Sequence, residues 1–245
     1  MTLFRIVDVA DLETFRALPP CADPGFDHRT CDYWEDGERG SRAARLAWLD
    51  VPVAVPPTKP SLADNPFAPA SPGPAFNAFF EDEEGEPGQA ENPFAPTVVR
   101  ERPARAGVPR KYALLDRGRG IFGTYAKVGL IGESAVAYAQ FGPLSAYPRG
   151  QRVRDLYPQL PASPLPAVIT CIATTSEARG AGHARTLVAA VCDDLAARGF
   201  SAVEAYPEVG ARAEATSAAT PGFWLGCDFT MAIDDDRFPV MRREL

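Results

Sequence analysis

The residues best suited to chemistry lie together in one short stretch, Arg-Gly-Ala-Gly-His-Ala at positions 179–184. An apolar run ends just before this stretch and apolar residues at helical spacing follow it, which predicts a strand-to-helix turn. Small residues let the backbone approach a ligand closely, and the first turn of a helix offers free N–H groups and the positive end of the helix dipole. The stretch therefore has the properties of a phosphate-binding loop, with backbone amides and one positive charge supplied by Gly180, Ala181, Gly182, His183, Ala184 and Arg179.

The spacing of the two glycines does not by itself decide what the turn does. It matches neither the dinucleotide fingerprint GxGxxG nor a P-loop, because no Lys-Ser or Lys-Thr pair follows. Two interpretations therefore stay open at this point. The turn is either a cradle for phosphate groups or a pair of glycines that only permit a tight turn.

The elements that position this turn follow from hydrophobic periodicity. Residues 182–198 are predicted to form a helix, because Leu187, Val188, Val191 and Leu195 recur at helical spacing. Gly199 stands where a helix-ending glycine belongs. Strands are predicted at residues 3–7, 125–131, 135–141, 167–173, 202–206, 229–233 and 238–242.

The remaining regular elements are short. A helix is expected early in the chain, and another at residues 223–225. Residues 111–122 are expected to form one helix, with Tyr112, Leu115 and Ile121 on an apolar side. Residues 132–134 read as a hairpin turn, and a proline-rich loop is expected to continue as far as Pro166. This mixture of helices and strands predicts an α/β or α+β fold.

The composition changes abruptly near residue 51, which predicts three parts. Residues 52–107 are crowded with Pro, Ala, Asn, Glu and Gly and have no hydrophobic periodicity, so we expect a disordered insertion. Residues 1–51 and 108–245 would together form the folded domain. The insertion repeats Asn-Pro-Phe-Ala-Pro, beginning at Asn65 and again at Asn92. A turn that presents a single Phe is suited to docking a protein partner, although a duplicated linker without function is the alternative.

The overall composition excludes several classes of function. A formal net charge of −7 argues against nucleic-acid binding, which normally needs a basic surface. There is no apolar run of about 18 residues, which argues against a membrane span. The first residues lack the features of a secretory signal, so an intracellular, cytoplasmic protein is expected. Five scattered cysteines without a CxxC pair suggest reduced thiols, and two histidines are too few for a His-based metal site or nucleophilic triad, so no metal is expected.

The turn also resembles a known family. Arg179, Gly182 and Ala184 match the Q/R-x-x-G-x-G/A signature of the GNAT acetyltransferase superfamily, on the strand, turn and helix where that family carries it. The order of elements after the turn is similar too, and the segments 31–35, 137–143 and 203–207 resemble uncharacterised bacterial GNAT proteins. The resemblance covers residues 1–51 and 108–245. It implies a mixed, mostly antiparallel central sheet flanked by helices, and acetyl-CoA as the cosubstrate.

The resemblance further implies where the cosubstrate binds. Backbone groups of the fourth strand would hold the pantetheine arm, and the amides of residues 179–184 would hold the pyrophosphate. The acetyl group would pass directly to an amine of a small molecule or peptide, with a fourth-strand N–H stabilising the developing oxyanion. A protein nucleophile is not needed, so Cys171 is better interpreted as a strand residue than as a catalytic thiol. The fourth-strand residues concerned are Cys171, Ile172 and Ala173.

Proton transfer needs further residues. Glu204 is the best candidate for the base, with Tyr206 on the same face of the strand, although a carboxylate on a solvated strand face is the alternative. Trp34 and Glu35 lie where GNAT proteins recognise acceptors. Trp224 occupies the position at which many GNAT enzymes have a Tyr that protonates the departing thiolate, and indole cannot act as an acid. Asp228 replaces the glycine of the usual Gly-Phe ending.

Two functions follow from these observations. The first is an acetyl-CoA-dependent N-acetyltransferase whose acceptor the sequence does not name. The second is a catalytically weak CoA-binding or scaffold protein that recruits a partner through its two Asn-Pro-Phe motifs. Tight CoA binding without turnover on any amine would favour the second.

Overall fold

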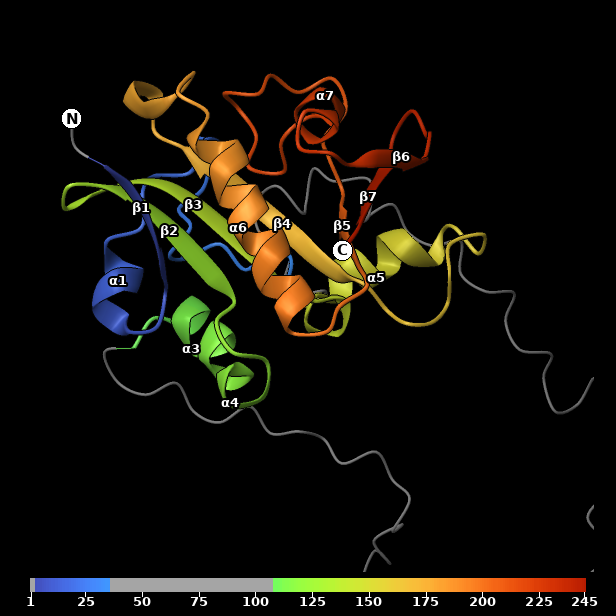
Figure 1. Cartoon of the computed structure of the whole chain (residues 1–245), viewed down its shortest axis with the longest axis horizontal. Helices are drawn as coiled ribbons and strands as arrows, with labels where there is room; N and C mark the ends of the chain where they lie inside the picture. Colours follow the sequence, from blue (N-terminus) through green and yellow to red (C-terminus); the bar gives the residue numbers. More distant parts are fainter. Residues whose placement is uncertain (1–2, 36–107) are drawn as a thin grey trace, which may run out of the picture. The chain divides into compact units, whose positions relative to one another are not determined.

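The computed structural model describes residues 3–35 and 108–245 (Figure 1). The predicted insertion at 52–107, with both Asn-Pro-Phe motifs, lies outside the described residues. Its disorder and its docking role therefore stay predictions, as do the domain boundaries.

A seven-stranded sheet with the order β1-β2-β3-β4-β5-β7-β6 forms the centre of the described part (Figure 1). Every neighbouring pair is antiparallel except β4 and β5, which run parallel. The predicted mixed, mostly antiparallel sheet is thus confirmed. The strands are β1 (Phe4–Asp8), β2 (Ala126–Ile131), β3 (Ser134–Pro143), β4 (Ala167–Thr174), β5 (Ala202–Ala205), β6 (Thr230–Ile233) and β7 (Val240–Glu244).

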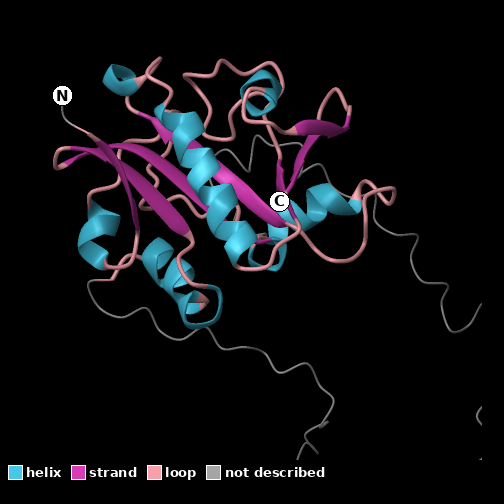
Figure 2. Cartoon of the chain, viewed as in Figure 1, coloured by secondary structure: helices cyan, strands magenta, loops and turns pink. Residues whose placement is uncertain are grey.

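Helices flank the sheet, and the longest of them crosses it (Figure 2). This helix, α6, buries an apolar side made by Leu187, Val188, Val191 and Leu195, as the periodicity predicts. It ends at Gly199, whose φ of +85° is a left-handed conformation that favours glycine. The helices are α1 (Leu12–Arg16), α3 (Arg110–Arg117), α4 (Arg119–Phe122), α5 (Pro148–Asp155), α6 (His183–Ala197) and α7 (Pro221–Leu225), with 3-10 turns η3 (Leu144–Ala146) and η4 (Ser176–Ala178).

The two faces of the sheet have different partners. One face packs against α6 and α7, and its core includes Phe141, Ile169, Leu187 and Trp224. Side chains alternate along each strand, so the opposite face carries a second set of residues, such as Tyr138 and Gln140. Tyr138 packs there with Phe15 of α1 and with Leu115 of α3 in a second, smaller core.

Strands β4 and β5 separate along their length. β4 pairs with β3 as far as Thr174, whereas its pairing with β5 ends at Ile169 and Ala205. Beyond that point one edge of β4 has no neighbouring strand. The backbone groups on this edge are the ones that a ligand or a loop can reach.

The prediction of a single helix at 111–122 is wrong. The segment forms α3 and α4, with Gly118 between them. A Cβ atom at Gly118 would lie only 2.0 Å from the hydroxyl oxygen of Tyr125, so close packing of this ring explains the glycine. The break also turns Ile121 outward. Its side chain is 99% exposed, contrary to the predicted apolar side.

Two other element predictions need correction. The expected proline-rich loop before Pro166 contains η3 and the eight-residue helix α5, which begins with Pro148 at its first position. Proline suits that position because the N–H it lacks has no partner within a helix. The last strand runs from Val240 to Glu244, two residues later than predicted.

Candidate functional site

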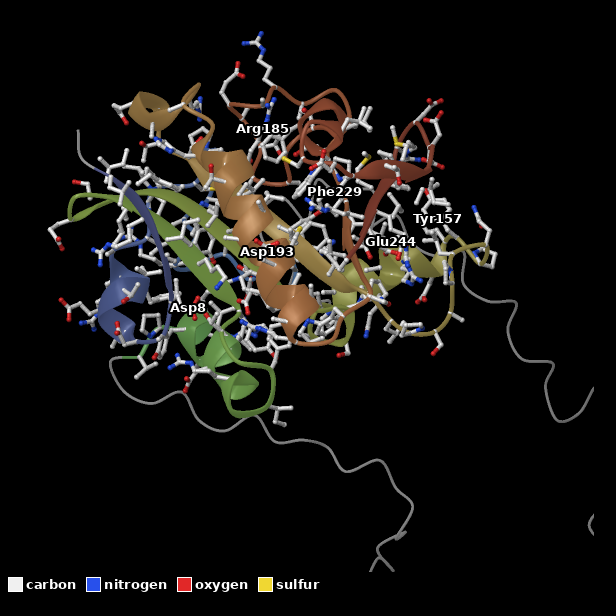
Figure 3. All side chains as sticks on the ribbon, viewed as in Figure 1. Asp8, Tyr157, Arg185, Asp193, Phe229 and Glu244 are labelled. Carbon is white, nitrogen blue, oxygen red and sulfur yellow. The ribbon has the colours of Figure 1, made fainter. Side chains whose placement is uncertain are left out.

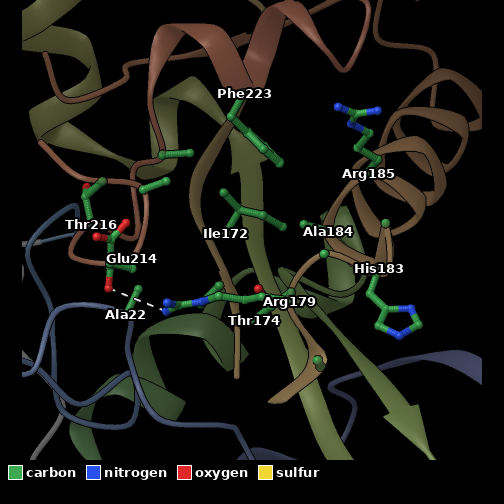
Figure 4. Close-up of a pocket in the computed structure, with 16 residues that line it drawn as sticks. Ala22, Ile172, Thr174, Arg179, His183, Ala184, Arg185, Glu214, Thr216 and Phe223 are labelled. Atoms are coloured by element: carbon green, nitrogen blue, oxygen red, sulfur yellow. Dashed lines mark hydrogen bonds between the residues drawn. The ribbon is translucent and has the colours of Figure 1, made fainter. Parts of the chain in front are cut away.

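A cavity of about 580 Å³ lies where β4 meets the start of α6 (Figure 4). Its volume is within the range of about 300–1,000 Å³ found for ligand pockets. It opens on the free edge of β4, the glycine turn and the segment 207–220 that joins β5 to α7. Its lining residues are Ala22, Ile172, Ala173, Thr174, Ala178, Arg179, Gly180, Gly182, His183, Ala184, Arg185, Ala213, Glu214, Thr216, Ala219 and Phe223.

The glycine turn has the geometry of an anion cradle. Gly180 and Gly182 have φ values of +79° and +81°, and a Cβ at either position would meet no heavy atom within 4 Å. Among the described residues, no acceptor takes the amide N–H of Gly180, Ala181 or Gly182. Gly182 is also the N-cap of α6, so these donors lie at the positive end of the helix dipole. The turn thus offers free amides to an anion such as a pyrophosphate.

Two arginines carry positive charge at the cavity. Arg179, predicted from the sequence, extends across it, and its Nη2 donates to the carbonyl oxygen of Glu214 at 3.5 Å (Figure 4). Arg185 also lines the cavity and lies at the N-terminal end of α6 (Figure 3). Sequence reasoning missed Arg185, although a cation in the first turn after a phosphate-binding loop was a usable signal. Long-range packing brings Ala22, Glu214 and Phe223 to the same cavity, and no local pattern indicated them.

The His183 side chain points away from the centre of the cavity (Figure 4). Its ring stacks on Phe4 of β1, with centroids 4.2 Å apart and planes 21° apart. Only the backbone of His183 is therefore directed toward a ligand in the turn.

The free edge of β4 is contacted by the segment 207–220. The amide N–H of Ile172 donates to the carbonyl oxygen of Ser217 at 2.7 Å. Ser217 Oγ also shares a 2.7 Å hydrogen bond with Cys21 Sγ. Trp224 holds the same segment, because its indole Nε1 donates to the carbonyl oxygen of Ala218 at 3.0 Å. Trp224 is 1% exposed and serves here as a buried anchor for the segment.

The other residues predicted on β4 lie as expected on the strand. Ile172 and Ala173 line the cavity, whereas Cys171 is on the opposite face of the sheet, with Tyr138. Burial raises the pKa of the Cys171 thiol well above its usual value. A thiol in this state is a poor nucleophile, which supports its interpretation as a strand residue.

Glu204 and Tyr206 come together on the face of the sheet opposite α6. The Tyr206 hydroxyl donates to Glu204 Oε2 at 3.1 Å. Glu204 Oε1 accepts from Arg154 and, at 2.9 Å, from Arg242. The Glu204 side chain is 0% exposed, so the alternative of a carboxylate on a solvated strand face is wrong. Burial, and then the neighbouring Glu204 carboxylate, raise the pKa of Tyr206 well above its usual value.

The predicted acceptor residues lie on this same face. The rings of Trp34 and Tyr206 have centroids 6.1 Å apart. Glu35 Oε1 accepts from Lys111 and, at 2.7 Å, from Gln140. The structure thus brings Trp34 beside Tyr206 and Glu35 against Gln140 of β3, while the cavity with the glycine turn is lined by other residues. Residues 3–35 and 108–245 include neither a helix able to cross a membrane nor a group of three or more His, Cys, Asp or Glu side chains that could hold a metal.

Solved structures similar to this chain exist, whereas the sequence comparisons find no match. No protein-family model matches the chain, and no curated protein sequence matches it. Similar solved structures include an N-acetyltransferase from Staphylococcus aureus, with 18% identity, 55% of this chain and 74% of that chain covered, and a TM-score of 0.36. A GNAT family N-acetyltransferase from Escherichia coli in complex with CoA has 18% identity, 53% and 65% coverage and a TM-score of 0.33. Ard1 from Thermoplasma volcanium has 14% identity, 57% and 82% coverage and a TM-score of 0.38.

Their TM-scores are all below 0.5, so these similar structures support no conclusion about the fold or the reaction of this chain. They include GNAT acetyltransferases, the family that the residues Arg179, Gly182 and Ala184 resemble. The site geometry has to carry any conclusion about activity.

Proposed function

We propose that the protein is an acetyl-CoA-dependent N-acetyltransferase that acts on an amine of a small molecule or peptide. One observation carries this proposal. Free amides in the turn at Gly180 and Gly182, at the start of α6, open onto a 580 Å³ cavity beside the edge of β4 that has no neighbouring strand among the described residues. An anion cradle and an extended strand edge next to each other suit a ligand with a pyrophosphate at one end and an amide-bearing arm at the other.

The residues present fit the roles that the transfer requires. The amides of residues 180–184 would bind the pyrophosphate, with Arg179 and Arg185 supplying charge. The edge amide of Ile172 would donate to the thioester carbonyl oxygen and stabilise its developing negative charge. This amide is the one that donates to Ser217 in the structure, so binding requires the segment 207–220 to release it.

The chemical step is a direct acyl transfer. The amine nitrogen forms a bond to the acetyl carbon, the carbon–sulfur bond breaks, and the sulfur leaves as a thiolate. Besides the proton of the ammonium group, the nitrogen loses one more proton as the amide forms, and water carries that proton to the thiolate. The proton of the ammonium group passes to the Tyr206 oxygen while the Tyr206 hydroxyl proton passes to Glu204 Oε2, along the observed 3.1 Å hydrogen bond. Glu204 has no other free route to the acceptor, because its second oxygen is bonded to Arg154 and Arg242.

A second candidate function is CoA binding without efficient turnover. Two observations favour it: Ser217 already holds the Ile172 amide, and Trp224 is a buried anchor where an acidic hydroxyl would be needed. In this case the Asn-Pro-Phe motifs, outside the described residues, would supply the function by recruiting a partner.

The test is a panel of amines incubated with acetyl-CoA and the full chain, with released thiol as the measurement. Thermal melting with CoA alone is recorded in parallel, since a ligand that binds the native state raises the melting temperature. Thiol release above background with any amine supports the acetyltransferase. A CoA-induced melting shift without amine-dependent thiol release supports the second candidate. Absence of a melting shift rejects both.

A further inference from the structure

Unpaired polar atoms gather on the face of the sheet opposite α6. Among the described residues, four buried side-chain atoms have no hydrogen-bond partner: His28 Nε2, Glu35 Oε2, and Nη1 and Nη2 of Arg149. His28 packs on Tyr138, with ring centroids 4.6 Å apart, and Glu35 bonds Gln140. The Tyr138 hydroxyl donates to Gln140 Oε1 at 3.1 Å, so these residues form one connected group.

Arg149 lies next to this group, because its amide N–H donates to the carbonyl oxygen of Trp34, the residue before Glu35, at 3.5 Å. It lies in the first turn of α5 and is 0% exposed. Its Nε donates to the carbonyl oxygen of Tyr33 at 2.8 Å, and its guanidinium carbon lies 4.4 Å from the centre of the Tyr33 ring. These two contacts fix the plane of the guanidinium and leave both terminal nitrogens for another partner.

A buried cation without a partner is costly, because burial removes its hydration and nothing replaces it. Native proteins leave few such groups, and they retain them where the partner is a ligand, an ion or water. Two parallel N–H donors on a planar fork match the two oxygens of a carboxylate. The free end of Arg149 therefore indicates an anionic ligand group, with a carboxylate as the best geometric match.

Glu35 supplies the opposite charge in the same group. Its Oε1 is held by Lys111 and Gln140, and its side chain is only 6% exposed. Its Oε2 is buried and unpaired, and an acceptor oxygen on a carboxylate suits an ammonium group. A ligand that carries both an ammonium and a carboxylate would satisfy Glu35 and Arg149 together.

The group lies next to the proposed reaction residues. Arg149 contacts Tyr33, Tyr33 packs edge-on against Trp34 at 5.2 Å, and Trp34 lies 6.1 Å from Tyr206. The residue after Arg149 also approaches Tyr206: a Cβ at Gly150 would be 3.3 Å from that ring. Residues 17–35, which carry His28, Trp34 and Glu35, contain turns but no helix or strand. A segment without a helix or strand can open to admit a ligand to atoms that are sealed in this structure.

We propose that Arg149 and Glu35 form the acceptor subsite, and that the acceptor is an amine that also carries a carboxylate. The proposal rests on the proposed acetyltransferase function and names its substrate class. Arg149 binds the carboxylate with its two terminal nitrogens, and Glu35 Oε2 binds the ammonium form before it is deprotonated. The same carboxylate chemistry is present in a free amino acid and at the C-terminus of a short peptide.

The test compares ligands that differ only in the carboxylate. L-Phenylalanine, L-phenylalaninamide and 2-phenylethylamine form one such set, and leucine and glycine with their amides and decarboxylated amines form two more. The dipeptides Gly-Gly and Gly-Gly-amide distinguish a peptide source from a free amino acid. In the wild-type full chain we expect at least one carboxylate member to have a kcat/KM about 10- to 100-fold above its amide, through KM, which corresponds to a charge-assisted pair.

The variant Arg149→Met separates binding from structure. Methionine fills similar volume without a charge, so the ligand-free variant should melt at the wild-type temperature or above it, as expected when an unpaired buried charge is removed. It should lose the carboxylate preference to within about 3-fold. Arg152→Gln, on the exposed side of the same helix, is the matched control and should keep the preference. Glu35→Gln also breaks the buried pair with Lys111, so it is assessed only by the ligand-dependent melting shift, which should decrease for the amine-bearing members and not for the corresponding carboxylic acids.

The outcomes distinguish this proposal from the proposed function. Melting shifts with the same ligands, measured without acetyl-CoA, report the subsite even if no acetyl transfer occurs. Carboxylate-dependent shifts that Arg149→Met abolishes support the subsite, whether or not thiol is released. Acetylation without carboxylate preference overturns the subsite and leaves the acetyltransferase intact. A marked loss of stability in ligand-free Arg149→Met would show a structural role and would also overturn it.

Discussion

Two glycine variants at the ends of α6, Gly182→Asp and Gly199→Asp, should rank in opposite order for ligand-free stability and for ligand binding. Gly182 begins α6 and Gly199 follows its end, and both have left-handed φ values, of +81° and +85°. A Cβ at either position meets no heavy atom within 4 Å, so a side chain costs only the left-handed strain, about 1 kcal/mol. An aspartate at 182 is favoured by the helix dipole and one at 199 is opposed by it, each by about 0.5 kcal/mol.

These magnitudes predict the ligand-free melting temperatures. Gly182→Asp should lose about 0.5 kcal/mol and Gly199→Asp about 1.5 kcal/mol. For a domain of this size, 1 kcal/mol shifts the melting temperature by about 2–4 °C. We therefore expect the melting temperature to decrease by about 1–2 °C in Gly182→Asp and by about 3–6 °C in Gly199→Asp. Gly199→Asp, the control for ligand binding, is thus the less stable variant.

Ligand binding should show the opposite order. At a concentration 100 times Kd, acetyl-CoA stabilises the native state by about 2.7 kcal/mol, a shift of about 5–10 °C. A carboxylate at 182 placed about 5 Å from a phosphate repels it by about 3 kcal/mol at an effective dielectric constant of about 20. Affinity then falls about 100-fold, and the same concentration stabilises Gly182→Asp by only about 0.4 kcal/mol. Gly199→Asp should keep the full shift.

Differential scanning fluorimetry gives six melting temperatures, with and without acetyl-CoA for the wild type, Gly182→Asp and Gly199→Asp. The reasoning is refuted if Gly182→Asp keeps the wild-type shift, because the pyrophosphate would then bind elsewhere. Equal loss of the shift in both variants would also refute it, since a general effect on α6 would explain the result without a phosphate contact.

Three further predictions follow from named contacts. Tyr206→Phe keeps the ring beside Trp34 and removes the hydroxyl bonded to Glu204. Its kcat should fall by about 10²–10⁴-fold while the CoA melting shift stays unchanged, and normal turnover would exclude this proton route. Burial, and then the charge of Lys111, lower the pKa of His28 from 6.5 to about 4. The unfolded chain therefore binds this proton more readily than the folded one, and the free energy of unfolding should decrease by up to about 3 kcal/mol as the pH falls from about 6.5 to about 4. Urea titrations should show a smaller loss in His28→Gln than in a variant at the other histidine, His183→Gln. Trp224→Phe removes the bond to Ala218 and should speed hydrogen exchange in residues 207–220, and unchanged exchange would mean that the indole does not hold this segment.

The sequence predicts the glycine turn and α6 well because their signals are local. The two glycines of the turn, the apolar spacing of α6 and the glycine that follows its end all lie within residues 180–199. The single-helix prediction at 111–122 failed because helical spacing does not show a contact made outside the helix. The position of Gly118 depends on Tyr125, which comes just before β2 and fills the space where a side chain would be. Helix α5 was missed because Val153 is its only strongly apolar buried residue, so it has no periodicity to detect.

The opposite face was much less predictable. Trp34, Glu35, Glu204 and Tyr206 were all identified, with Glu204 and Tyr206 on one face of a strand, but the residues that surround them were not. Their surroundings come from β3, β7, α3 and α5, which are distant in the chain, and no spacing rule connects them. The buried Arg149 gave no signal at all in the sequence, because an arginine in the first turn of a polar helix is normally expected in solvent.

The surroundings of Glu204 change how its chemistry should be tested. A carboxylate on a solvated strand could be replaced by glutamine with little effect on folding. Glu204 is instead fully buried between Arg154 and Arg242, and breaking a buried pair leaves an uncompensated charge at a cost of about 3–5 kcal/mol. Loss of activity in Glu204→Gln would therefore not separate a catalytic role from a structural one. The hydroxyl of Tyr206 is neutral and can be removed without breaking an ion pair, so it is the atom on which the proposed proton transfer can be tested.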